Sequence, residues 1–210
     1  SFVDEVAHAL RRDPLELRLA LLGEPRKLPY QGHGGPEFDT GRMSAVLQLV
    51  ADKIGWGREP GKGRGLGIAG HFVFGGYAAH AFEVSVDGQG ELAIHRCVCA
   101  VDVGQVVNPL GVEAQMMGAT IDGLSTALGL EITLKDGQVQ QSNFHDYPLL
   151  PGAKAPDVEV HIVASRLRPS GAGEMGIPTV APALANAIFA ATGKRIRELP
   201  LAQRLREAMA

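Results

Sequence analysis

The stretch "SGAGEMGIP", residues 170–178, places one carboxylate, Glu174, among three glycines and directly before a helix-like run, "PTVAPALANAIFAATG". Because glycine has no side chain, a rigid planar ligand can approach such an acid within hydrogen-bonding distance. Backbone N–H groups at the start of a helix favour an anion in that place. The stretch suits a glutamate that abstracts a proton, but for this loop alone the favoured interpretation is an exposed glycine turn with an incidental acid.

The letters "GAGEMG" at 171–176 also match the G-x-G-x-x-G fingerprint of dinucleotide-binding proteins. Glu198 even stands about twenty residues downstream, where that fingerprint has an acid. However, the 34 residues after Gly176 are too few for the repeated βαβ units that a nucleotide needs. Pro178 and Pro182 also crowd the first turn of the helix, so the sequence disfavours a nucleotide site.

The composition is that of an ordinary globular protein, since the 210 residues are 45% hydrophobic and 20% charged, with a net charge of −3. Basic residues occur only in short pieces such as "GKRIR", which argues against a nucleic-acid partner because phosphate binding needs a concentrated basic face. No apolar run approaches the ~20 residues that span a bilayer. The chain starts with "SFVDEVAHALRRD", without Met and helical at once, so we expect a piece of a longer or processed protein.

Glycine is unusually frequent, with 27 glycines beside 13 prolines. Many tight turns would explain these residues, and so would backbone wrapped closely around a large ligand. Cys97 and Cys99 point to one face of a strand, but a metal site needs further ligands and no second cysteine pair exists. Two small buried residues are the simpler interpretation, and no metal ligands are predicted.

Two regions are expected along the chain. The apolar periodicity of residues 1–60 predicts a helical arm, and the Pro/Gly-rich composition at 24–40 predicts a linker within it. Residues 61–210 predict a domain in which strands alternate with helices, because period-two apolar patterns from residue 63 onward are followed by helical segments, one of them at 178–192. The expected fold class is α+β, a mixed sheet with packed helices.

A second group of candidate residues follows the third strand, in "AVDVGQVVNPLGVEAQMMGATIDGL". Asp102 stands at the strand end, where site residues are common, although a turn-capping acid is equally expected. Asn108 predicts the start of a helix as its cap. On that helix, Gln115 lies near one face with Gly118 and Gly123, where its amide either hydrogen-bonds a polar ligand or is satisfied in the core.

The positions of the histidines in the sequence do not indicate a catalytic centre. His145 and Asp146 are neighbours in the loop "SNFHDYP", which makes neither a metal site nor a triad, and no G-x-S-x-G elbow is present. His71 and His80 alternate with apolar residues in strands. They are interpreted as packed or surface residues rather than ligands.

Several of these segments together resemble a known family. "AVDVGQVVNPLGVEAQMMGATIDGL", "QSNFHDYPLLP" and "GAGEMGIPTVAPALANAIFAATGKRIRELPL" look like the C-terminal portion of the large subunit of the molybdenum hydroxylases, the xanthine dehydrogenase and aldehyde oxidase family. The "SNFHDYP" loop and the opening "SFVDEVAHALRRDPLELRLALL" look most like its isoquinoline 1-oxidoreductase β-subunit branch. The resemblance covers almost the whole chain and depends on the order and spacing of several motifs.

The resemblance implies the C-terminal part of a molybdopterin-binding domain, in which Glu174 is the catalytic base that takes a proton from a hydroxide ligand of molybdenum. The cofactor implied is a molybdenum-molybdopterin, commonly in its cytosine dinucleotide form in bacteria. The reaction implied is oxidation of an aldehyde or an N-heterocycle with oxygen from water. The candidate cofactor-binding residues are Gln115, Gly171, Ala172, Gly173 and Gly176.

The resemblance also implies partners: the remaining N-terminal part of the molybdenum subunit, a small subunit with [2Fe-2S] clusters, frequently a cytochrome c subunit, and a small-molecule substrate. Because the chain looks like only the final part of such a subunit, we expect it to form one wall of a site that is active with the rest. Relatives occur in the bacterial cytoplasm and periplasm, so no compartment is assigned. The alternative function is a non-catalytic scaffold or binding domain of the same fold.

Overall fold

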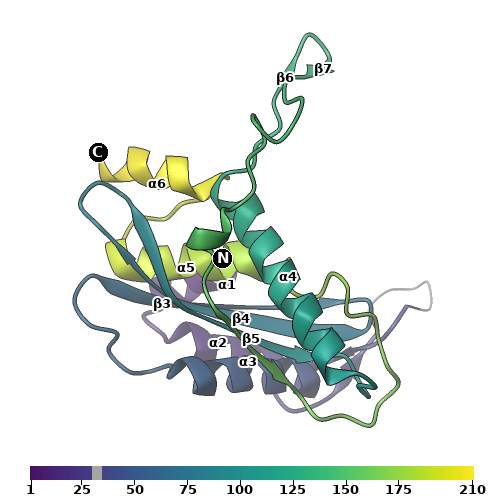
Figure 1. Ribbon diagram of the computed structural model, residues 1–210. Helices are drawn as coiled ribbons and strands as arrows, with labels where there is room; N and C mark the ends of the chain where they lie inside the picture. The colour runs from purple at the N-terminus through teal and green to yellow at the C-terminus, as the bar shows by residue number, and fades with distance from the viewer. Residues whose placement is uncertain (30–34) are drawn as a thin grey trace.

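The computed structural model describes residues 1–29 and 35–210, and its centre is a four-stranded sheet in the order β3-β4-β5-β8. The first three strands are antiparallel, and β8 pairs parallel to β5. The predicted α+β class with a mixed sheet is therefore confirmed (Figure 1). The strands are β3 (Arg64–Val73), β4 (Gly76–Val86), β5 (Leu92–Asp102) and β8 (Val158–Ile162).

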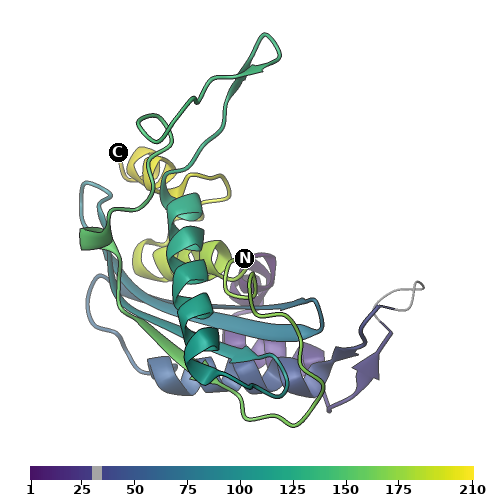
Figure 2. The ribbon, with the colours of Figure 1, turned by 45° about the vertical axis from the view of Figure 1, so that its right-hand side comes forward.

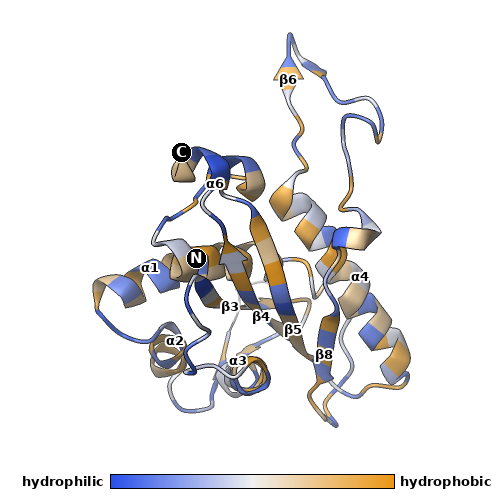
Figure 3. Ribbon diagram, turned by 60° about the vertical axis from the view of Figure 1, so that its left-hand side comes forward, coloured by the Kyte–Doolittle hydropathy of each residue, from blue (hydrophilic) through white to orange (hydrophobic). Residues whose placement is uncertain are grey.

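Helices cover both faces of this sheet, so that it forms the middle of three layers (Figures 1 and 2). On β4, Phe82 and Val84 pack into the core beneath α5, while Ala79 and Ala81 pack into the opposite core against α3. Long hydrophobic stretches of β4 and β5 therefore lie between helices (Figure 3). The helices are α1 (Phe2–Ala9), α2 (Pro14–Leu22), α3 (Thr40–Ile54), α4 (Pro109–Leu128), α5 (Val180–Thr192) and α6 (Leu201–Met209).

Helix α5 lies unusually close to β3, because two glycines of the strand face its backbone. A Cβ atom on Gly67 would lie 2.1 Å from the Ala187 nitrogen and 2.3 Å from the Ala183 oxygen. A Cβ on Gly65 would lie 2.3 Å from the Ala187 oxygen. Only glycine allows this approach, which brings the alanine face of α5 onto the sheet.

Several helices begin with a side-chain cap, as predicted for Asn108. Asp13 accepts hydrogen bonds from the N–H groups of Leu15 and Glu16 and begins α2. Asn108 accepts one from Gly111 at the start of α4. The helix predicted from residue 178 instead begins at Val180.

The first sixty residues are not only an arm, since α3 buries its apolar side in the core against β4 and β5. The expected linker at 24–40 contains a two-stranded ladder, in which β1 (Lys27–Leu28) pairs with β2 (Phe38–Asp39). Part of that linker prediction, residues 30–34, lies outside the described residues. The division of the chain at residue 60 stays a prediction.

A hairpin after α4 extends away from the body of the molecule (Figures 1 and 2). Its strands are β6 (Leu134–Lys135) and β7 (Gln138–Val139), and a short 3-10 helix, η1 (Gly152–Lys154), follows. Leu134 is 72% exposed and Phe144 is 71% exposed, so this hairpin adds no apolar core. Among the described residues, no helix combines the length and apolar character required to cross a bilayer.

Candidate active site

The loop that carries Glu174 is anchored at the end of the sheet where β5 stops and the β3–β4 turn reverses the chain. The Ser170 nitrogen donates a hydrogen bond to the Val103 oxygen (2.9 Å). Met175 is 1% exposed and belongs to the apolar cluster between β4, β5 and α4. A Cβ on Gly76 would lie 2.6 Å from the Met175 Cε atom, so strand and loop are in close contact. The residue after Glu174 therefore fixes the loop in the core.

Glu174 itself is exposed. Its side chain forms no hydrogen bond or ion pair within residues 1–29 and 35–210. A Cβ on Gly171 would meet no atom within 4 Å, and a Cβ on Gly173 would meet only the Gln115 Nε2 atom, at 3.9 Å. The flanking glycines thus leave open space around the carboxylate, and the catalytic role of Glu174 stays a prediction.

Helix α4 forms the neighbouring wall of the loop. Gln115 is exposed on its second turn, beside Gly173. Gly176 is buried against the same helix, because a Cβ there would lie 2.9 Å from the Ala119 Cβ and 3.4 Å from the Met116 oxygen. Ala172 packs at the edge of the Met175 cluster. All six candidate residues from the sequence therefore lie on one loop and on the helix that faces it.

An open hollow of about 750 Å³ adjoins the loop. Gly171 and Ser170 line it, but Glu174 does not. Three basic side chains, Lys27, Arg42 and Arg168, also contribute to its wall. Nothing in the sequence pattern pointed to these residues, because they come from three distant segments.

Asp102 has a structural role at this end of the sheet. Its two carboxylate oxygens each accept a hydrogen bond from Arg42, both at 2.7 Å, and one also accepts from the Gly104 N–H at 3.0 Å. Arg42 additionally donates to the Gly75 oxygen and lies over the Tyr77 ring. Burial alone would raise the pKa of Asp102, but the hydrogen bonds from Arg42 and Gly104 outweigh it and lower that pKa. The turn-capping alternative is thus the one observed.

His80 is fully buried, which agrees with its interpretation as a packed residue. Its ring connects β4 with α4 and with the residue directly before α5. Its Nδ1 atom lies 2.6 Å from the Thr179 Oγ1, and its Nε2 atom lies 2.9 Å from the Thr120 Oγ1. Burial lowers the pKa of His80 to about 3, so the ring is neutral. No local pattern connects His80 with these two threonines, and the one usable signal is that a threonine stands directly before α5.

Other predicted features are distant from the loop or have packing roles. Gly123 packs against Val180 of α5, where a Cβ would lie 2.8 Å from the Val180 Cγ2. Cys97 and Cys99 are free and buried, and burial raises the pKa of the Cys99 thiol to about 12. Asp146 accepts hydrogen bonds from backbone N–H groups of its own loop. No group of three or more His, Cys, Asp or Glu side chains in the described part of the chain is arranged to hold a metal ion.

The dinucleotide fingerprint at 171–176 lacks the context that it requires. β8 ends at Ile162, so no strand leads directly into the glycines, and β3, β4 and β5 are antiparallel. Glu198, the acid expected on a ribose, is paired with Arg204 at 3.1 Å. The fingerprint is therefore a coincidence of spacing.

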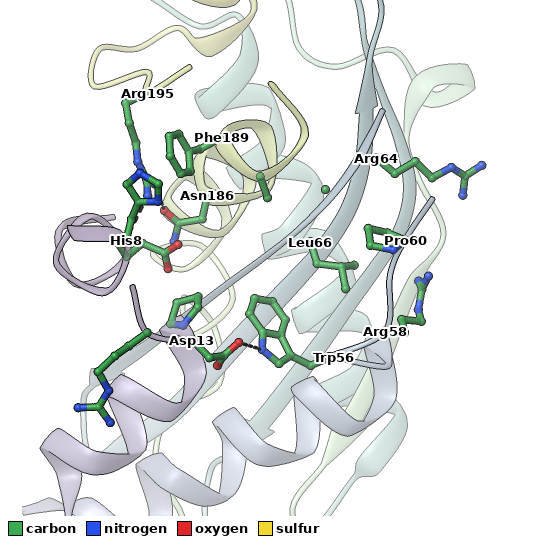
Figure 4. A pocket seen from close by; sticks show the side chains of 16 residues that line it. His8, Asp13, Trp56, Arg58, Pro60, Arg64, Leu66, Asn186, Phe189 and Arg195 are labelled. Carbon is green, nitrogen blue, oxygen red and sulfur yellow. Dashed lines mark hydrogen bonds between the residues drawn. The ribbon is translucent and has the colours of Figure 1, made fainter. Parts of the chain in front are cut away.

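A second cavity, of about 380 Å³, lies at the other end of β3, between α1, α5 and the segment that follows α3 (Figure 4). The Trp56 indole N–H donates to the Asp13 carboxylate at 2.9 Å, and the Arg195 guanidinium lies 3.4 Å from the centre of the Phe189 ring. This cavity holds none of the candidate site residues, so it is separate from the Glu174 loop.

Similarity to known proteins extends over nearly the whole chain. A family model described as a molybdopterin cofactor-binding domain matches residues 60–156. The β-subunit of isoquinoline 1-oxidoreductase from Brevundimonas diminuta is 35% identical over 205 residues, which are 96% of this chain and 24% of that protein. The chain belongs to the molybdenum hydroxylase family.

Further molybdenum hydroxylases agree with this assignment. A nicotinate dehydrogenase subunit of Pseudomonas putida is 34% identical and matches 100% of this chain but 18% of its own length. The crystal structure of the aldehyde oxidoreductase from Desulfovibrio desulfuricans has a TM-score of 0.55 and 29% identity, over 64% of this chain and 16% of that chain. The chain thus spans at most about a quarter of these relatives.

Proposed function

We propose that this chain supplies the glutamate-bearing wall of a molybdenum hydroxylase active site, which oxidises an aldehyde or an N-heteroaromatic substrate with oxygen from water. The observation that carries the proposal is the exposed Glu174 carboxylate preceded by two glycines without close side-chain neighbours. Met175 anchors the loop in the core, so the carboxylate is presented on a fixed support. A fixed support matters because a general base must meet its proton within hydrogen-bonding reach.

The residues present fit a large planar cofactor. Open space extends from Gly171 and Gly173, so a ring system can approach the loop backbone there. The exposed Gln115 amide can both donate and accept hydrogen bonds to its polar edge. We assign Ala172 and Gly176 backbone contacts only, because their side-chain positions are already packed. The cofactor is a molybdenum-molybdopterin, in the cytosine dinucleotide form.

The bound cofactor supplies the redox centre that accepts two electrons from the substrate. In this chain, an Oε atom of Glu174 accepts the proton that the water-derived nucleophile releases. The glycines beside Glu174 also leave room for the substrate to reach the carboxylate. The chain thus contributes proton transfer and orientation, and the rest of the subunit completes the site.

The proposed enzyme is an assembly of several subunits. The Brevundimonas and Pseudomonas relatives are both named as subunits of their enzymes, which supports partner chains here as well. We assign it the N-terminal part of the molybdenum subunit, a small subunit with [2Fe-2S] clusters and a cytochrome c subunit as electron acceptor.

Replacing Glu174 in the assembled enzyme tests the proposal. Glu174→Gln keeps the shape of the side chain but removes the base, so turnover falls by at least ~10²–10⁴-fold while molybdenum remains bound. Glu131→Gln, another exposed acid at the base of the hairpin, is the matched control and leaves turnover unchanged. Normal turnover in Glu174→Gln would refute the assignment.

The scaffold alternative has one observation in its favour, since Glu174 does not line the adjoining hollow. Metal analysis distinguishes the two functions. A purified native complex with neither molybdenum nor pterin fluorescence indicates a scaffold, whereas both signals indicate the enzyme.

A further inference from the structure

A buried chain of hydrogen bonds connects the two walls of the proposed site. The Thr120 hydroxyl donates to the Met116 oxygen at 2.7 Å, one turn earlier on α4. A hydroxyl has a single hydrogen, so Thr120 can only accept from His80. The His80 Nε2 atom is therefore the N–H donor, and its Nδ1 atom accepts from the Thr179 hydroxyl. All the hydrogen bonds run in one direction, from Thr179 through His80 to Met116.

The two ends of this chain coincide with the two walls. Met116 follows Gln115 in α4 and touches Gly176 of the loop. Thr179 ends the segment that carries Glu174 and precedes the first residue of α5. His80 is 0% exposed and sits on β4, at the centre of the sheet. One buried side chain on an internal strand of the sheet thus contacts both walls.

The threonine at position 179 is used for this link instead of a helix cap. A threonine at the N-cap usually accepts a backbone N–H of the first turn. Thr179 makes no such bond, and it is 1% exposed. Its hydroxyl is committed to His80 at 2.6 Å. The Thr179 hydroxyl therefore contributes to a connection between elements and not to the cap of α5.

We infer that His80 is a positioning residue, which fixes the distance between the Glu174 loop and Gln115 by hydrogen-bonding Thr179 on one side and Thr120 on the other. The inference rests on the proposed function, because the two walls that His80 would position belong to the proposed site. A buried imidazole with both nitrogens bonded cannot shift without breaking a hydrogen bond. A displacement of about 1 Å in a positioned group is enough to lower turnover by about 10²-fold.

Variants of His80 in the assembled enzyme separate the two connections. His80→Leu removes both hydrogen bonds. In His80→Asn, the Oδ1 atom replaces the acceptor towards Thr179, and in His80→Gln the Nε2 atom replaces the donor towards Thr120. Hydrogen–deuterium exchange measured by mass spectrometry then reports on each wall. We expect faster exchange of 170–178 in His80→Gln, of 113–119 in His80→Asn, and of both segments in His80→Leu.

Turnover per bound molybdenum gives the functional result. We expect His80→Leu to lower kcat by about 10- to 100-fold with a smaller change in KM, because the loss concerns orientation rather than uniform binding. Asn186→Ala is the matched control: this side chain is 1% exposed, donates to the Ile68 oxygen at 3.1 Å and lies farther along α5. It lowers the melting temperature but leaves turnover per molybdenum and exchange of 170–178 unchanged.

Thr179→Val provides a second variant if His80→Leu does not assemble, since it removes only one hydroxyl. Unchanged turnover per molybdenum in Thr179→Val and in every assembled His80 variant, with Glu174→Gln inactive, overturns the positioning role and leaves the proposed function intact. Equal turnover losses in Asn186→Ala and the His80 variants also overturn it, because they indicate a general structural effect. Full turnover in Glu174→Gln overturns both inferences.

Discussion

Two groups of glycines in this molecule have opposite surroundings. Gly65 and Gly67 of β3 lie directly under α5, where a Cβ would be 2.1–2.3 Å from helix backbone atoms. Gly171 and Gly173 precede Glu174, and a Cβ at either would meet at most one side-chain atom, at 3.9 Å. In the first group the absence of a side chain is required by the chain's own packing. In the second, no residue among 1–29 and 35–210 fills the space.

The contrast separates glycines that the packing of the described residues requires from glycines whose side-chain position is open. Glycine costs backbone entropy on folding, about 0.5–1 kcal/mol relative to alanine. Under α5 the close helix–strand packing offsets that cost. At Gly171 and Gly173 no contact within the described residues offsets it, which supports a ligand as the group that occupies the space. Substitutions in the two groups should therefore differ sharply in their effect on stability.

The largest effect on stability is expected for Gly67→Ala. The new methyl group would overlap the backbone of α5, and backbone cannot move aside as a side chain can. We expect a loss of more than about 3 kcal/mol in the free energy of unfolding, at the upper end for overpacked cores. Chemical denaturation followed by circular dichroism measures it. A loss below about 1 kcal/mol would show that α5 can move away from β3.

Asp102→Asn is expected to come next, because it breaks the ion pair of the buried Asp102 carboxylate with Arg42 at the end of β5. Breaking a buried ion pair costs about 3–5 kcal/mol, and the partly exposed Arg42 reduces this to about 2–3 kcal/mol at pH 7.

The pH dependence of that loss identifies its cause. The pKa of Asp102 is lowered in the folded state, so its contribution is complete above the unfolded value of about 3.9 and disappears as the pH falls through the folded pKa. The difference in the free energy of unfolding between the two proteins should therefore be full at pH 7 and shrink as the pH falls below the unfolded pKa. A constant difference would mean that shape, not charge, holds the turn.

Gly176→Ala is an intermediate case, since this glycine belongs to the loop but packs against α4. The new methyl group would lie 2.9 Å from the Ala119 Cβ, which is too close for two carbon atoms, so the loop or α4 has to shift. We expect a loss of about 1–2 kcal/mol. Adding Ala119→Gly restores the space, so the double variant should be more stable than the sum of the single changes predicts, as a double-mutant cycle would measure. Strict additivity would contradict this contact.

Local features were predicted from the sequence better than contacts between distant segments. The cap at Asn108 follows from neighbouring residues, because the asparagine stands directly before the helix. The parallel pairing of β8 with β5, by contrast, depends on a crossover that no local pattern records. His80 shows the limit clearly: its two partners are 40 and 99 residues away, so sequence reasoning saw only a packed histidine.

The same limit applies to the candidate site. "GAGEMG" showed three glycines around Glu174, but the sequence did not distinguish the two open ones from Gly176, which is packed. The difference depends on where α4 passes. That position is set by contacts of α4 with α5 and β8, far from the motif in sequence.

The smallest effect on stability is expected for Gly173→Ala. The backbone of Gly173 is not in the left-handed region, and the methyl group meets only the flexible end of Gln115. The free energy of unfolding should therefore stay the same or rise by up to about 1 kcal/mol, through lower entropy of the unfolded chain.

In the assembled enzyme, however, the methyl group of Gly173→Ala enters the space assigned to the cofactor, so molybdenum content or turnover falls. Gly118→Ala is the matched control, because its Cβ also meets nothing within 4 Å but lies on exposed α4 away from the loop. If Gly173→Ala and Gly118→Ala both leave metal content and turnover unchanged, the open glycines serve no ligand, and the contrast with Gly65 and Gly67 loses its functional meaning.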